Sequence, residues 1–121
     1  MTTTELNTLR SVCCEPLLEA PLTDDDAQQL ARVFKALADP ARLRLPSLIA
    51  AQPGGEACNC DLIEPVALSQ PTVSHHLRVL HDAGLVERER RGQWVYYRLV
   101  PGQLSALRAA LAPSPSAVAP A

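Results

Sequence analysis

The chain has 121 residues and a formal net charge of −2, with 47% hydrophobic but only 3% aromatic side chains. This length predicts one small domain with a core of Leu, Val, Ala and Ile. There is no charged-then-apolar leader and no apolar run of about 18 residues or more, so neither secretion nor membrane insertion is indicated. We therefore expect a cytoplasmic protein that does not associate with a membrane.

The charge is unevenly distributed along the chain. Residues 1–39 carry seven acidic and three basic side chains, whereas residues 69–121 carry six Arg and all three His against three acids. A basic second half is compatible with a nucleic-acid partner.

Residues 1–22 have little periodicity and predict an N-terminal arm that carries Cys13 and Cys14. Thr23 followed by three Asp is typical of a helix start, because carboxylates stabilise the positive end of the helix dipole. The apolar stripe of this first helix repeats every three to four residues, at Leu30, Val33, Phe34 and Leu37.

Asp39 and Pro40 predict the end of the first helix and the start of a second, with Asp as the cap. Pro46 lies inside the second helix, where a kink is expected because proline removes a backbone hydrogen bond. A short third helix is expected over about 59–65, ended by the constraint that Pro65 places on the preceding residue.

Ser69 is expected to cap a fourth helix, with Val73, Leu77 and Leu80 facing inward and Gly84 as its stop. From Leu85 the hydrophobic pattern alternates, which predicts a β-hairpin with Arg91-Gly92 at its turn. A last helix follows, and its expected apolar stripe is Leu104, Leu107 and Leu111. Residues 114–121 predict a disordered tail.

This order of elements predicts a winged helix-turn-helix domain over residues 23–113, mainly α with a β-hairpin wing. In such a domain the second helix of the motif lies in the major groove of DNA. The side chains opposite its core stripe, or at its N-terminus, are Gln70, Thr72, Ser74, His75 and Arg78. Arg88, Arg90 and Arg91 cluster at the wing tip, where they could meet phosphates or a minor groove.

Three segments, "FKALADPARLRL", "CNCDL" and "LSQPTVSHHLRVLHDAGLVERERRGQWVYYRL", together resemble the ArsR (ArsR/SmtB) family of metal-responsive repressors. The resemblance covers about residues 30–100, and Pro46 departs from the aliphatic residue that is usual at its position. It implies a homodimer in which the first and last helices form the interface. It also implies binding to operator DNA that ends when an inducer binds.

The "CNCDL" segment is similar to the box in which arsenic and cadmium/lead sensors bind their inducer through both cysteines. Residues two apart on a regular helix point about 200° away from each other. One ion can therefore bind Cys58 and Cys60 together only if Cys58 lies at or before the first helical turn. Cys13 and Cys14 are the candidate further ligands, from the same protomer or from its partner.

A site made only of Cys selects soft, thiophilic ions. The adjacent pair Cys13-Cys14 resembles the arm of some arsenite-responsive members of the family more than the spaced arm cysteines of the cadmium/lead type. This resemblance favours As(III) or Sb(III) as the inducer, and the four thiols leave Cd(II) or Pb(II) as the alternative. Residues 101–113 contain no Asp, Glu, His or Cys, which excludes the last-helix zinc site of other family members. No organic cofactor is indicated.

Two other functions use the same thiols. One is a repressor that responds to thiol oxidation. The other is a thiol-dependent reductase, which is disfavoured because the sequence lacks a Gly-rich loop that could hold an oxyanion. We therefore expect a regulator and not an enzyme.

Overall fold

The structure is a computed structural model that describes residues 21–112. Cys13, Cys14, the rest of the predicted arm up to residue 20, and the predicted tail at 114–121 lie outside the described residues. The chain divides into two compact units, one of residues 33–100 and one of residues 1–32 with 101–121.

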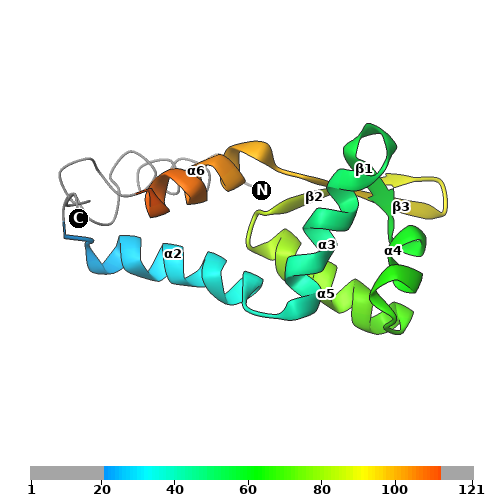
Figure 1. Ribbon diagram of the computed structural model, residues 1–121, viewed down its shortest axis with the longest axis horizontal. Coiled ribbons are helices and arrows are strands. Elements are labelled where there is room, and N and C mark those ends of the chain that lie inside the picture. Colours follow the sequence, from blue (N-terminus) through cyan, green and yellow to red (C-terminus); the bar gives the residue numbers. More distant parts are fainter. Residues whose placement is uncertain (1–20, 113–121) are drawn as a thin grey trace, which may run out of the picture. The chain divides into compact units, whose positions relative to one another are not determined.

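Residues 33–100 contain a bundle of three helices and a small sheet (Figure 1). Helix α3 packs against both α4 and α5, and α4 packs against α5. The sheet has the strand order β1-β3-β2, with both pairs antiparallel. In chain order the elements are α3 (Pro40–Ala51), the 3-10 turn η1 (Pro53–Gly55), β1 (Glu56–Cys58), α4 (Asn59–Val66), α5 (Gln70–Asp82), β2 (Val86–Arg91) and β3 (Trp94–Leu99).

This order confirms the predicted mainly α architecture with a hairpin wing. The core is aliphatic, as the composition suggested. Its most deeply buried residues, with at most 1% exposed surface, include Leu45, Ile49, Leu62, Val73, Leu77, Leu80 and Leu85. All three predicted core residues of α5 are among them.

The predicted caps are also present. The Asp39 carboxylate accepts the N–H of Ala41 at 2.8 Å, and Ser69 accepts that of Thr72 at 3.4 Å. Gly84 follows α5 with a φ of 79°, a conformation that side chains disfavour and glycine adopts without strain. Helix α3 continues across Pro46 as a single element.

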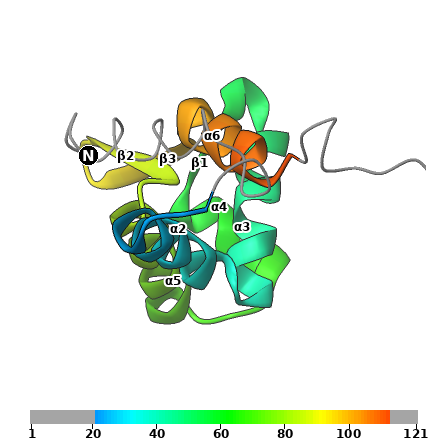
Figure 2. The same cartoon turned by 90° about the vertical axis from the view of Figure 1, so that its left-hand side faces the viewer.

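Three local details differ from the predictions. Residues 56–58 form a third strand, β1, which was not predicted, so the wing is part of a three-stranded sheet (Figure 2). Arg91 pairs with Trp94, which moves the hairpin turn to Gly92 and Gln93. Helix α4 occupies the predicted place but runs through Pro65 to Val66, because the N–H of Ala67 closes its last turn on the carbonyls of Ile63 and Glu64.

The flanking helices were predicted in position but only partly in their buried faces. Helix α2 (Asp24–Leu37) begins after Thr23 and buries Leu30 and Val33, while Phe34 is 36% exposed. Helix α6 (Pro101–Leu111) buries Gln103, Ala106, Leu107 and Ala110. Leu104 is half-buried and Leu111 is 51% exposed, so the predicted α6 stripe holds only at Leu107. Within residues 21–112, no helix combines the length and apolarity needed to cross a membrane.

Candidate nucleic-acid interface and thiol site

Helix α5 separates its apolar and polar side chains cleanly. Val73, Leu77 and Leu80 are fully buried. Ser74 is half-buried, and the other predicted contact residues are exposed: Gln70, Thr72, His75 and Arg78. This face therefore presents amide, hydroxyl, imidazole and guanidinium groups, and amide and guanidinium groups can hydrogen-bond to base edges in a major groove.

A hydrogen bond ties α5 to α3. Arg42 Nη1 lies 3.0 Å from His76 Nδ1, and Arg42 Nε donates to the carbonyl of Ala36 at 2.7 Å. Because arginine has only donors, His76 Nδ1 is the acceptor in this hydrogen bond. Neither Arg42 nor His76 was among the predicted site residues. Their contact fixes the rotation of α5 against α3.

Asp39 supports the same corner of the fold. Burial would raise its pKa, but the N–H groups of Ala41 and Arg42 that donate to its carboxylate, with the positive charge of Arg42, lower it below the usual range. The ionised carboxylate thus holds the start of α3, from which Arg42 reaches α5.

The three predicted wing arginines are in two different environments. Arg88 and Arg90 are exposed, and with Val95 and Tyr97 they line a hollow of about 420 Å³. The register pairs Arg88 with Tyr97 and Arg90 with Val95, so all four lie on one face of the sheet. In the part of the chain that the structure describes, neither Arg88 nor Arg90 forms an ion pair.

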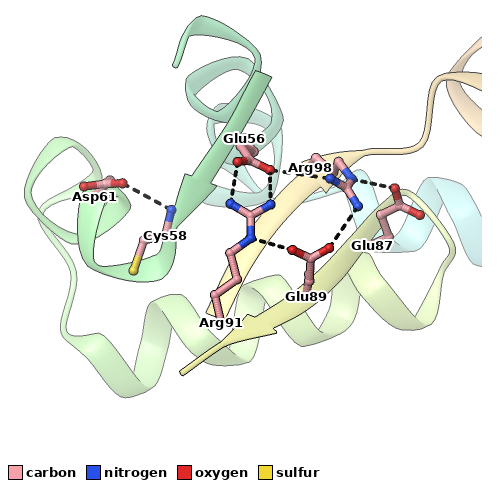
Figure 3. A network of polar contacts seen from close by, with 7 residues as sticks. All are labelled: Glu56, Cys58, Asp61, Glu87, Glu89, Arg91 and Arg98. Atoms are coloured by element: carbon pink, nitrogen blue, oxygen red, sulfur yellow. Dashed lines mark hydrogen bonds and ion pairs between the residues drawn. The ribbon is translucent and has the colours of Figure 1, made fainter. Parts of the chain in front are cut away.

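Arg91 points to the opposite face and is held there by carboxylates (Figure 3). Its Nη1 and Nη2 donate to the two carboxylate oxygens of Glu56 at 2.6 and 2.8 Å, and its Nε donates to Glu89. Its guanidinium carbon also lies 4.5 Å from the centre of the Tyr96 ring. Arg98 extends the network, bonding to Glu87 at 2.8 Å and to Glu56 at 3.5 Å.

The hydrogen bond from Arg91 lowers the pKa of both Glu56 and Glu89 below their usual range, and those carboxylates in turn raise the pKa of Arg91. The network is therefore ionised at neutral pH. Glu56 was not among the predicted site residues, and its partner lies 35 residues away in the sequence.

The two described thiols lie where β1 becomes α4. Cys58 is the last residue of β1 and the N-cap of α4, with extended backbone angles of −71° and 149°. Its Sγ accepts the N–H of Cys60 at 3.3 Å and donates to Asn59 Oδ1 at 3.3 Å. Cys58 therefore meets the geometric condition set above for both thiols to bind one ion.

Asp61 completes this helix start. Its Oδ2 accepts the N–H of Cys58 at 3.1 Å while the Cys58 sulfur caps α4, so the two side chains form a reciprocal capping box. The sequence interpretation did not assign Asp61 a role. Its position three residues after a polar cap was the available signal.

Cys58 and Cys60 differ in exposure. Cys58 is only 2% exposed, whereas Cys60 is exposed to solvent. The hydrogen bond with Cys58, with smaller contributions from burial and from the charges of Cys58 and Asp61, raises the pKa of Cys60 to about 11. Cys60 is therefore a protonated thiol at neutral pH.

The structure brings Cys58 and Cys60 together and says nothing of Cys13 and Cys14, which lie outside it. No third His, Cys, Asp or Glu completes a metal-binding cluster within residues 21–112.

Known proteins resemble this chain mainly in the region just described. Residues 39–88 match the family model described as bacterial regulatory protein, arsR family. Over 69 residues the chain is 52% identical to the arsenic resistance transcriptional regulator ArsR1 of Pseudomonas putida, covering 57% of this chain and 52% of that protein. It is 36% identical over 78 residues to a homologue of the cadmium resistance regulatory protein CadC from Staphylococcus aureus, covering 64% and 63%.

Among solved structures, the AntR antimony-specific transcriptional repressor is 32% identical, with a TM-score of 0.62, covering 76% of this chain and 79% of that one. The matched segment spans little more than half the length of the first curated relatives. These relatives and the family are transcriptional regulators and not enzymes. From the shared winged helix-turn-helix and these matches, the chain belongs to the ArsR family of bacterial regulatory proteins.

Proposed function

We propose that this protein is a transcriptional repressor that binds operator DNA as a homodimer and leaves it when a thiophilic ion binds its cysteines. The observation that carries the proposal is the position of Cys58. Cys58 is the last residue of β1, and its sulfur caps α4 by accepting the N–H of Cys60. Helix α4 packs directly against α5, the helix with the polar exposed face.

In this proposal DNA is contacted by α5 and by the hollow face of the wing. Gln70, His75 and Arg78 contact base edges in the major groove, and Thr72 and Ser74 lie on either side of this contact surface of α5. Arg88 and Arg90, which have no ion-pair partner within residues 21–112, bind phosphates. Arg91 is engaged by Glu56 and Glu89, and it is therefore left out of this contact set.

The inducer is proposed to be As(III) or Sb(III), bound by Cys58 and Cys60 together with Cys13 or Cys14. Soft ligands favour such ions, and two thiolates alone make a weak chelate. The names of relatives that concern arsenic and antimony support this choice. The CadC homologue supports Cd(II) or Pb(II) as the alternative.

Release follows from the double role of the Cys58 sulfur. An ion that binds this atom changes both the start of α4 and the end of β1. Helices α4 and α5 are joined by only three residues, 67–69, so a shift of α4 moves the DNA-contacting face of α5. A coupling of about 1.4 kcal/mol is enough for a tenfold loss of DNA affinity.

The redox alternative requires a thiol that ionises easily, because thiolates are the form that oxidants attack. The raised pKa of Cys60 works against it. Ion binding is compatible with a high pKa, since the ion displaces the proton.

The test measures binding of the protein to fluorescently labelled DNA from upstream of its own gene by fluorescence anisotropy. Sodium arsenite, antimonite, Cd(II), Zn(II) or hydrogen peroxide is then added to the complex, and release of the DNA is followed. We expect release by arsenite or antimonite from wild type, and none from a Cys58→Ser/Cys60→Ser variant. A Cys13→Ser/Cys14→Ser variant decides whether the arm contributes ligands. Release by Cd(II) alone would change the inducer, release by peroxide alone would favour the redox alternative, and absence of DNA binding would overturn the proposal.

A further inference from the structure

The carboxylate–guanidinium network lies between the thiol site and the wing tip, and neither DNA contact nor ion binding as proposed above uses it. It joins all three strands of the sheet: Glu56 from β1, Arg98 from β3, and Glu87, Glu89 and Arg91 from β2 (Figure 3). Glu56 precedes Cys58 by two residues on the same three-residue strand. A side chain that binds Glu56 therefore restrains β1, the strand that ends at Cys58.

Arg91 is the side chain that connects the wing tip to this strand. It is the last residue of β2, next to the turn at Gly92 and Gln93. From there its guanidinium crosses the face of Tyr96 and makes two parallel hydrogen bonds to Glu56. The stacking fixes the plane of the guanidinium, and the bidentate bond fixes its direction.

The strand register shows which residues a movement of β1 would displace. Cys58 pairs with Tyr96 on β3, and Tyr96 in turn pairs with Glu89 on β2. Arg91 contacts Tyr96 and bonds to both Glu56 and Glu89. A displacement of Cys58 would therefore shift Tyr96 and Glu89, its neighbours across the sheet, and Arg91 contacts both of them.

We propose that Glu56 and Arg91 form a clamp that transmits ion binding at Cys58 to the wing, so that Arg91 is a positioning residue and not a phosphate contact. The inference rests on the proposed function and adds a second route to it. The first route runs from Cys58 through α4 to α5. The second runs from Cys58 through β1 and Arg91 to the hairpin that carries Arg88 and Arg90.

The test compares operator affinity with and without sodium arsenite (or Cd(II), if that ion releases the wild type) for Glu56→Gln, Arg91→Gln and the double variant. The ratio of the two affinities measures coupling. We expect each single variant to reduce this ratio about fivefold, and the double variant to reduce it no further, because both changes open one clamp. The salt dependence of DNA binding is expected to stay as in wild type.

Arg90→Gln is the matched control, because Arg90 is the neighbouring arginine on the opposite face of the sheet. It is expected to lower operator affinity and to reduce the slope of log affinity against log salt by about 0.9, as loss of one phosphate contact does. Its coupling ratio is expected to remain that of wild type. The same reduced slope in Arg91→Gln, or an unchanged coupling ratio in both clamp variants, would overturn the clamp.

A second measurement needs neither DNA nor an ion. Amide hydrogen exchange at residues 56–58 is expected to accelerate in Glu56→Gln and Arg91→Gln, since the clamp holds β1 to the sheet. Equal exchange in wild type and both variants would overturn the clamp even if the protein bound no DNA. Wild type that binds DNA but is released by no ion would instead overturn the proposed function and the transmission that rests on it, while faster β1 exchange in the variants would still show that Glu56 and Arg91 hold β1 to the sheet.

Discussion

In α5, the side chains that support the fold and those that meet solvent lie on opposite sides of one helix. Leu77 is fully buried and Arg78, the next residue, is exposed. At the β1–α4 junction, by contrast, the sulfur of Cys58 is buried, caps a helix and is the proposed ligand. Substitutions on the exposed side of α5 can change DNA specificity without loss of stability. At Cys58, by contrast, ion binding and the stability of the helix start depend on the same sulfur atom.

Leu77→Ala should have the largest effect and should act on stability alone. Deleting a fully buried leucine removes apolar contacts and leaves a cavity, which costs about 2–5 kcal/mol in the free energy of unfolding. Urea unfolding measures this loss. Arg78→Ala is the control on the adjacent residue, and a loss of more than about 0.5 kcal/mol there would break the separation between the two sides of α5.

Arg78→Ala should instead act on DNA binding. Loss of a guanidinium that contacts a base edge costs about 1–3 kcal/mol of operator affinity. Anisotropy at fixed salt measures it, with Arg108→Ala as a charge-matched control on α6. Equal effects of the two variants would mean that α5 contributes only general positive charge.

Cys58→Ala should alter stability and ion response together. The alanine cannot accept the N–H of Cys60, and loss of a helix cap costs about 1 kcal/mol. Cys58→Ser retains an acceptor oxygen and should be the more stable of the two in urea unfolding, while both lose release by arsenite. Wild-type stability in Cys58→Ala would show that the cap and the ligand are separable after all.

The smallest effect concerns the protonation of Cys60. Its folded pKa of about 11 lies above the ordinary value of 9.0. The stabilisation from this proton is therefore complete below pH 9 and is lost as the pH rises through about 11. At pH 9 about 1% of Cys60 is thiolate, against about half for an ordinary thiol.

Alkylation of Cys60 by iodoacetamide, followed by peptide mass spectrometry, checks this value without any ion. The rate should keep rising with pH up to about 11 in wild type. It should be higher at pH 9 in Cys58→Ala, because the side-chain hydrogen bond with Cys58, which favours the protonated Cys60 thiol, is the main cause of the raised pKa. Equal rates at pH 9 in the two proteins would assign the shift to another group.

The predictions that succeeded rest on short-range signals. The apolar spacing of α5, its Ser69 cap and the stop at Gly84 all lie within one segment, and the structure confirms each of them. The same holds for Asp39 and Pro40 at the start of α3. Such features depend on backbone conformation and helix periodicity, which neighbouring residues determine.

The features that were missed depend on partners far apart in the sequence. Strand β1 has only three residues, too few for an alternating pattern, and exists because β3 pairs with it. Arg91 was correctly placed at the wing tip, but its ion pair with Glu56 joins residues 35 positions apart. The α6 stripe failed similarly, because leucine spacing alone does not determine which side of a helix is covered.

The turn η1 before β1 has a practical consequence for protein engineering. Gly54 and Gly55 have φ values of 74° and 69°, and a Cβ built on either would meet no atom within 4 Å. The space around this turn is open, so insertions through flexible Gly-Ser linkers should be accepted there without repacking the core. A fluorescent domain inserted between the two glycines would be connected directly to the strand that ends at Cys58, and its emission could then serve as the readout of a genetically encoded biosensor.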